Sequence, residues 1–131
     1  MRATDGSALE AAAGYSRAAR YGSLICVSGT TANAPDGTAL HPGDTRAQTE
    51  TSLRRALECV DQLGGAPDSV VRTRILLAPG ADWLAASAGH RDVLGDVAPA
   101  NSMYYVHALI GDGFLVEVEV DAVVRPEGTH A

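Results

Sequence analysis

Three carboxylates alternate with apolar residues close to the end of the chain. Glu117, Glu119 and Asp121 are separated by single valines, and in a β-strand this spacing places all three side chains on one face. A carboxylate fixed on a sheet can act as a general base or orient a water molecule. The same pattern also fits a strand face that is exposed to solvent. The spacing nominates a candidate base and leaves its role open.

Two further titratable side chains, Tyr105 and His107, alternate on the preceding segment. If the turn between the two segments holds an odd number of residues, such as the three from 111 to 113, His107 lies opposite Glu117 and Tyr105 opposite Glu119. An even number would separate them. A histidine of pKa about 6.5 beside a carboxylate of about 4.3 supplies an acid and a base near neutral pH. The alternative role for both rings is packing at a subunit interface.

The composition disfavours several classes of function. The chain has 131 residues, enough for one domain, and its 16 acidic and 10 basic residues give a formal net charge of −6. We therefore expect no nucleic-acid partner, because such binding needs clustered positive charge. Every basic residue is arginine, so no lysine can form a Schiff base with a substrate.

Nothing in the sequence indicates a metal, a cofactor or a membrane. Cys26 and Cys59 lie in a strand pattern and a helix pattern, without metal-ligand spacing, and we expect two buried reduced thiols. No apolar run approaches the roughly 18 residues of a membrane span. The expectation is a cytoplasmic protein. His41 and His130, in a loop and a tail, are assigned no role.

The elements that position these residues follow from periodicity. Residues 14–31 form a hairpin-like segment that ends in a strand over 24–30. A helix is predicted from Thr45, with Gln48 in capping-box spacing, to the pair Gly64-Gly65. Its apolar stripe consists of Leu53, Ala56, Leu57, Val60 and Leu63. Asp82 begins a second helix that ends near Gly95. The stripe of that helix is Trp83, Ser87, His90 and Leu94.

Three more strands complete the chain. The first covers 71–77 and alternates between its faces, with Val71, Thr73, Ile75 and Leu77 on one side and Arg72 and Arg74 on the other. The other two, over 101–109 and 114–124, are joined by a tight turn at 111–113. Residues 1–13 and 125–131 are expected to be a frayed lead-in and a loose tail. The prediction is a single domain with its core at about 14–124.

This order of elements predicts an α+β fold. Both helices can cover one face of a mostly antiparallel sheet, and the other face then stays uncovered.

Four blocks of the sequence resemble the Rid family, the YjgF-type reactive intermediate deaminases. They are residues 14–31 with Ser28-Gly29-Thr30, the helix start at 44–49, the strand at 70–74, and the Val-Glu-Val-Glu strand at 115–122. Each block alone is common in turns and sheets, and the resemblance rests on all four in register. It implies a chorismate-mutase-like fold, a homotrimer that packs sheet against sheet, and clefts for a small-molecule substrate between subunits.

The resemblance also implies roles for single residues. Glu117 is the better match to a family glutamate that positions a water in the cleft, and Glu119 is the fallback. Tyr15 matches an aromatic residue that closes the cleft. The turn at Ser28-Gly29-Thr30 matches one whose backbone contacts substrate. Ser87 and, more weakly, His90 stand where the family often lines the neighbouring cleft.

One position departs from the family pattern. Rid deaminases have the sequence Pro-Ala-Arg-Ser at the start of the fifth strand, where the arginine binds a substrate carboxylate. The corresponding residues in this chain are Pro99-Ala100-Asn101-Ser102. An asparagine amide has neither the charge nor the fork of a guanidinium. We expect weak hydrolysis of amino-acid-derived imines unless Arg72 or Arg74 supplies the clamp. Asn101, Ser102 and Met103 remain candidate substrate contacts.

The predicted function is acid/base catalysis on a small imine, enamine or enol, by hydrolysis, tautomerisation, elimination or cyclisation. Glu117, Tyr105 and His107 are the catalytic candidates. The alternative is a non-catalytic, metabolite-binding or chaperone-like trimer. An enzyme should place two titratable groups within hydrogen-bond reach, whereas a binding protein could leave Glu117 alone. A third reading, an endoribonuclease, is disfavoured by the negative charge.

Overall fold

The computed structural model describes residues 1–126. The elements are β1 (Arg2–Ala3), α1 (Ala8–Ala13), β2 (Ala18–Tyr21), β3 (Leu24–Thr30), α2 (Thr45–Gln62), the 3-10 turn η1 (Pro67–Ser69), β4 (Val70–Leu77), α3 (Trp83–Leu94), β5 (Ala100–Tyr105) and β6 (Val116–Val123). The expectations for His130 and for the last five residues of the tail lie outside the described residues.

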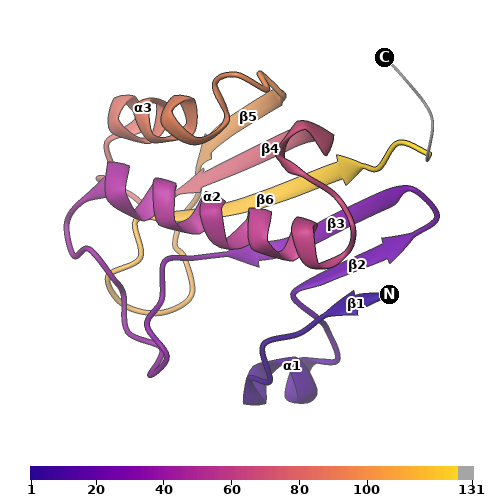
Figure 1. The fold of residues 1–131 in the computed structure, drawn as a ribbon. Coiled ribbons are helices and arrows are strands. Elements are labelled where there is room, and N and C mark those ends of the chain that lie inside the picture. The colour runs from indigo at the N-terminus through magenta and orange to yellow at the C-terminus, as the bar shows by residue number, and fades with distance from the viewer. Residues whose placement is uncertain (127–131) are drawn as a thin grey trace.

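A six-stranded sheet with the order β1-β2-β3-β6-β4-β5 forms the frame of the molecule. Figure 1 shows α2 and α3 side by side on one face of this sheet. Its strand pairs are antiparallel except β4–β5, which is parallel and is connected through α3. The α+β class and the two helices over one face are confirmed.

The core lies between α2 and the sheet. The four apolar residues that alternate along β6 are fully buried, as are Leu53, Ala56 and Val60 of α2. The carboxylates between the valines of β6 point to the opposite, helix-free face. The predicted alternation of β6 and the stripe of α2 are therefore confirmed.

The predicted hairpin of the last two strands is wrong. β4 lies between β5 and β6 and pairs with both. The reason is the crossover through α3, which returns β5 parallel to β4 at the outer edge of the sheet, so that β6 occupies the slot between β3 and β4. Residues 106–115 form a loop that connects β5 to β6, in place of the predicted tight turn.

The predicted N-terminal lead-in and the predicted cap of the first helix also need correction. Residues 1–13 are no frayed lead-in, because β1 pairs with β2 and Ala3 is buried. Helix α2 has Asp44 as its N-cap, with the carboxylate accepting from the Ala47 N–H at 3.0 Å. Gln48 does not complete a capping box. Its buried amide instead binds backbone groups of two loops, at Leu40, His41, Gly113 and Leu115.

Three smaller expectations also change. A register shift in β4 buries Val70 and exposes Val71. Trp83 is 52% exposed, and α3 packs on α2 through Ala86 and Gly89 instead. A Cβ at Gly89 would lie 3.0 Å from the Arg46 carbonyl oxygen, so a larger residue here would force the two helices slightly apart. Cys26, expected to be buried, is exposed on the helix-free face.

Candidate functional site

A β-bulge in β3 lies at the centre of the candidate site. Val27 pairs with Val120 and Thr30 with Val118, so β3 carries one residue more than β6 between these pairs. The extra residue turns the Thr30 side chain toward the helices, where it is buried. Ser28 is held by two bonds to the segment before β2, from its N–H to the Arg17 carbonyl at 2.9 Å and from its hydroxyl to the Ser16 carbonyl at 2.7 Å. The bulge is thus a fixed feature of the sheet.

Arg17 ties the bulge together from behind. Its Nη2 donates to the carbonyl of Gly29 at 2.6 Å and to the Thr30 hydroxyl at 2.8 Å. The guanidinium lies 5.8 Å from the ring centroid of Tyr15, within cation–π range. The predicted residues Tyr15, Ser28, Gly29 and Thr30 are therefore gathered around one arginine that the sequence analysis did not single out.

Glu117 lies directly against this bulge. A Cβ at Gly29 would come within 2.6 Å of Glu117 Oε2 and 3.0 Å of its carboxyl carbon. Burial raises the pKa of Glu117, the nearby charge of Glu119 raises it further, and Arg17 lowers it in part. Within the described residues this carboxylate accepts no hydrogen bond and has no salt-bridge partner. A half-buried, unpaired carboxylate with a raised pKa is suited to exchange protons.

The other two carboxylates of β6 are engaged elsewhere. Arg74 Nη1 lies 3.1 Å from Asp121 Oδ2 and 3.7 Å from Glu119 Oε1. This shared ion pair distinguishes Glu119 from Glu117, although both face the same side of the sheet. Arg74 is therefore occupied and is a poor substitute for the missing clamp. Arg72 makes a weak 3.4 Å contact with the hydroxyl of Ser102 and stays on the same face.

Tyr105 and His107 are not brought to Glu117. Tyr105 pairs with the core-facing Leu77, whereas Glu117 pairs with Leu76 and faces the other way. His107 lies in the loop after β5. The expected Tyr105–Glu119 and His107–Glu117 pairs are wrong. They assumed that β5 pairs with β6, whereas the neighbour of β5 is β4.

Tyr105 instead contributes to a separate hollow beside the start of α3. Its hydroxyl donates to the Ala81 carbonyl at 2.6 Å. Met103, two residues earlier on the same face, lines the same hollow. Ser87 of α3 donates to the Trp83 carbonyl, one turn back in its own helix. The predicted site residues thus fall into distinct groups within one chain.

Asn101 belongs to a third group, on the helix side of the sheet. Its amide donates to the hydroxyl of the fully buried Thr73 at 2.9 Å, and this hydroxyl lies 2.7 Å from His90 Nε2. Burial lowers the pKa of His90, which favours a neutral ring that accepts the Thr73 proton. Asn101 therefore has a structural partner at the position where the resemblance places a carboxylate clamp.

Comparison with known proteins assigns the fold to a family. Residues 5–124 match the family model described as endoribonuclease L-PSP. The chain is 40% identical to Rv2704 of Mycobacterium tuberculosis, a member of the YjgF/YER057c/UK114 family, with a TM-score of 0.83 over 95% of this chain and 98% of that one. The chain belongs to this family, the Rid or YjgF family. The predicted family is confirmed.

Two further proteins are similar. The Yersinia pestis Rid family protein YyfA, of unknown function, is 30% identical with a TM-score of 0.74, and the match covers 84% of this chain and 87% of that one. A Streptomyces coelicolor protein, the uncharacterised SCO2049, is 34% identical over 121 residues, which are 92% of this chain and 90% of its own length. Neither protein has an assigned activity, so the chemistry of this chain must be argued from the site.

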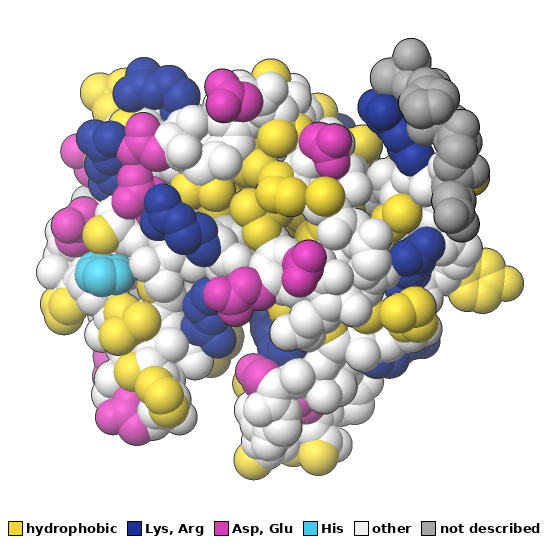
Figure 2. Space-filling model, viewed as in Figure 1, with side chains coloured by type: hydrophobic (Ala, Val, Ile, Leu, Met, Phe, Trp, Pro, Cys, Tyr) yellow, Lys and Arg dark blue, Asp and Glu magenta, His cyan; other side chains and the backbone are white. Residues whose placement is uncertain are grey.

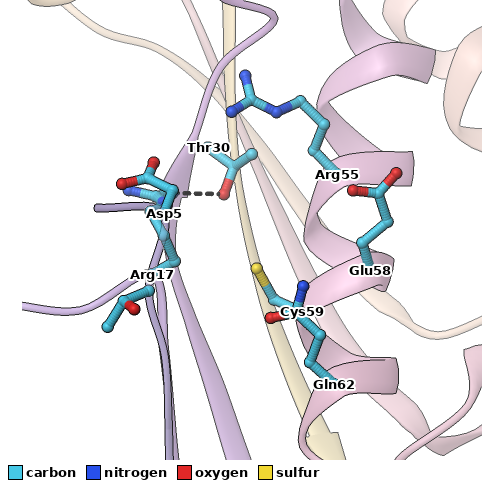
Figure 3. Close-up of a pocket in the computed structure, with 8 residues that line it drawn as sticks. Asp5, Arg17, Thr30, Arg55, Glu58, Cys59 and Gln62 are labelled. Atoms are coloured by element: carbon cyan, nitrogen blue, oxygen red, sulfur yellow. Dashed lines mark hydrogen bonds between the residues drawn. The ribbon is translucent and has the colours of Figure 1, made fainter. Parts of the chain in front are cut away.

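A small cavity lies behind the bulge of this Rid protein, on the side of α2. It has a volume of about 100 Å³, and Arg17 and Thr30 line it opposite Arg55 and Cys59 (Figure 3). Burial raises the pKa of the Cys59 thiol. The Arg55 guanidinium donates to the carbonyls of Thr31 and Asn33. The cavity separates α2 from the bulge and leaves Glu117 on the opposite side of the sheet.

Charge on the surface is mixed where Figure 2 displays it. Arginine and carboxylate side chains are interspersed over the helix-bearing face and form no single basic stripe. Among residues 1–126 no helix is long and apolar enough to cross a membrane. The same residues contain no cluster of three or more His, Cys, Asp or Glu side chains suited to a metal ion.

Proposed function

We propose that this Rid family protein is a cofactor-independent acid/base enzyme that acts on a small imine, enamine or enol. The observation that carries the proposal is Glu117, whose carboxylate is half-buried, unpaired within the described chain and held against the glycine of a bulge. Such a group can take a proton from water or from a carbon next to a C=N or C=O bond.

For an imine the proposed steps are as follows. The Glu117 carboxylate accepts a proton from a water molecule as the water oxygen bonds to the imine carbon, and it passes this proton to the imine nitrogen. As the C–N bond of the resulting carbinolamine breaks, Glu117 transfers the hydroxyl proton to the departing amine, and the carbonyl product forms. The backbone N–H groups of Gly29 and Ser102 are the proposed donors to a substrate oxygen. Tautomerisation, elimination or cyclisation would use the same carboxylate.

In this proposal Tyr105 and His107 can act with Glu117 only if they belong to a neighbouring subunit. Within one chain Tyr105 faces away from Glu117, so either ring would have to come from a neighbouring copy. We propose a homotrimer in which the helix-free sheet faces meet and the clefts lie between subunits. That face carries Arg72, Arg74 and the β6 carboxylates together with the exposed Cys26.

The second candidate is a non-catalytic trimer that binds a metabolite. It is favoured by the solitary position of Glu117, which has no second titratable group within hydrogen-bond reach in the described chain. A ribonuclease is disfavoured by the net charge of −6 and by the mixed charge of the displayed face.

Two measurements test the proposal. Light scattering after size exclusion should give three times the 13.5 kDa mass of the chain, and a monomer at micromolar concentration would rule out a site between subunits. Preformed imines and enamines of small ketones should then be hydrolysed faster with the trimer than without it. Saturable binding of these compounds without any turnover would favour the binding protein instead.

A further inference from the structure

An aromatic hollow lies where β4 and β5 end and α3 begins. It has a volume of about 280 Å³, and its lining consists of Leu77, Trp83, Met103, Tyr104 and Tyr105. No charged side chain is part of this lining. Trp83, Tyr104 and Tyr105 are each more than half exposed, so their rings remain available to a ligand.

Local structure holds the Tyr105 ring in place. Leu77 is fully buried, and Tyr105 pairs with it across the parallel β4–β5 ladder. The bond from the Tyr105 hydroxyl to the Ala81 carbonyl, at 2.6 Å, fixes that ring against the loop before α3. Trp83 is the first residue of α3, and the carboxylate of its N-cap Asp82 is turned to the N–H groups of Leu84 and Ala85. The nearest acid in the sequence is therefore engaged with the helix.

The strand that supplies Met103 and Tyr105 offers no counter-charge either. Asn101 lies on the same face of β5 as Met103 and Tyr105. In the ladder with β4 these three residues pair with alternate residues of one face, Thr73, Ile75 and Leu77 in that order. The amide of Asn101 donates to Thr73. A carboxylate in the hollow would thus lose part of its hydration without gaining an ion pair.

We infer that the aromatic hollow binds the uncharged, apolar or aromatic part of the substrate. This inference rests on the proposed function, since it names the class of imine, enamine or enol on which the trimer acts. The volume fits a single ring and is too small for a peptide helix. Two tyrosines and a tryptophan provide faces for stacking. The part of the substrate that occupies the hollow is accordingly apolar and carries no carboxylate.

The test uses the natural probe in the hollow, because Trp83 is the sole tryptophan of the chain. The intact protein is titrated with benzyl alcohol and with benzoate while tryptophan emission is recorded. These two probes share a ring and differ in charge. Benzyl alcohol should shift the emission saturably and bind at least about tenfold more tightly than benzoate, a difference of about 1.4 kcal/mol. Equal or tighter binding of benzoate, or no saturable response to benzyl alcohol, would overturn the inference.

Variants connect the signal to the hollow. Met103→Asp adds a charge to the lining and should weaken benzyl alcohol binding by about tenfold or more. Met103→Phe fills the space without a charge and should weaken it as well, which keeps the test valid if the first variant does not fold. Leu84→Asp is the matched control, since Leu84 is exposed beside Trp83 and is not part of the lining. Unchanged affinity in both Met103 variants would contradict the inference.

The two proposals fail in different ways. If the protein binds benzyl alcohol at Trp83 but turns over none of the imines or enamines, the proposed enzymatic activity is contradicted and binding in the hollow is supported. If turnover depends on Glu117 while the emission of Trp83 does not respond to benzyl alcohol, the proposed enzymatic activity is supported and the hollow is not the apolar subsite of the enzyme.

Discussion

The carboxylate of Glu117 occupies the space that a side chain at Gly29 would need. A Cβ there would lie 2.6 Å from Oε2, well inside the contact distance of a carbon and an oxygen. The close approach of Gly29 and Glu117 occurs at the bulge in β3. The extra residue of the bulge directs the Thr30 side chain to the helix side, and Gly29 lies beside Glu117. A side chain at position 29 would therefore push the Glu117 carboxylate out of its present place.

Replacing Gly29 by alanine should displace Glu117. We expect the Gly29→Ala variant to lose little of its free energy of unfolding, because the carboxylate at the end of the flexible Glu117 side chain can move aside. With a substrate of the proposed class, kcat should fall at least tenfold. Urea unfolding and steady-state kinetics measure both. Thr31→Ala, two residues further along, is the control, and equal effects of the two variants on kcat would contradict a specific clash.

The raised pKa of Glu117 predicts a pH dependence of stability. The folded state holds this proton to a higher pH than the unfolded state, whose carboxyl titrates near 4.3. The associated stability is complete below that value and is lost as the pH rises through the raised pKa. Glu117→Gln should therefore be more stable relative to wild type at neutral pH than at pH near 4. The gain should stay below about 1 kcal/mol because the group is half exposed.

Unfolding free energies across this pH range check the sign. Glu119→Gln serves as the control, since it removes an ion pair with Arg74 and should bring no such gain near neutrality. A Glu117→Gln variant whose relative stability declines as the pH rises would show that the carboxylate is stabilised as the anion.

Arg17 should influence Glu117 through its charge. Because Arg17 lowers the pKa of Glu117, Arg17→Gln should move the acid limb of kcat/KM to higher pH. The loss of its bonds to Gly29 and Thr30 should also cost about 1.5–3 kcal/mol of stability. Arg20→Gln is the matched control on β2, because Arg20 donates to the carbonyl of Leu63 at the far end of α2. If both variants leave the acid limb in place, Arg17 does not act on the site.

Asn101 should matter for stability more than for carboxylate binding. We expect Asn101→Ala to cost about 0.5–1.5 kcal/mol, because the hydroxyl of Thr73 loses a donor. Imines with and without a carboxylate should be compared as substrates of the wild-type protein. Turnover of the carboxylated imine above that of its neutral analogue would mean that another arginine supplies the clamp, and Arg72 would be the first to replace.

Local pattern predicted most of the fold. The stripe of Leu53, Ala56 and Val60 and the alternation of Val118 and Val120 each depend on burial of one face, and the structure buries these residues. Strand order was not accessible in the same way. Alternation fixes which residues share a face of a strand, but it does not say which strand is the neighbour. The separation of Tyr105 from Glu117 follows from that missing information.

The candidate site shows the same division. Tyr15, Ser28, Gly29 and Glu117 were predicted from the resemblance, and the structure gathers them at the bulge. Arg17 carries no motif and became visible only through its contacts with backbone carbonyls. The Asn101–Thr73–His90 chain joins β5, β4 and α3, and no sequence spacing indicates such a contact.

The comparison of Glu117→Gln with Glu119→Gln tests the central claim most directly. The two glutamates lie two residues apart on one strand face, and Glu119 alone is near Arg74. With a substrate of the proposed class, Glu117→Gln should lower kcat by on the order of 10²-fold or more in a trimer that stays intact, while Glu119→Gln should cost much less. Full activity of the Glu117→Gln trimer would contradict the assignment of Glu117 as the acid/base group.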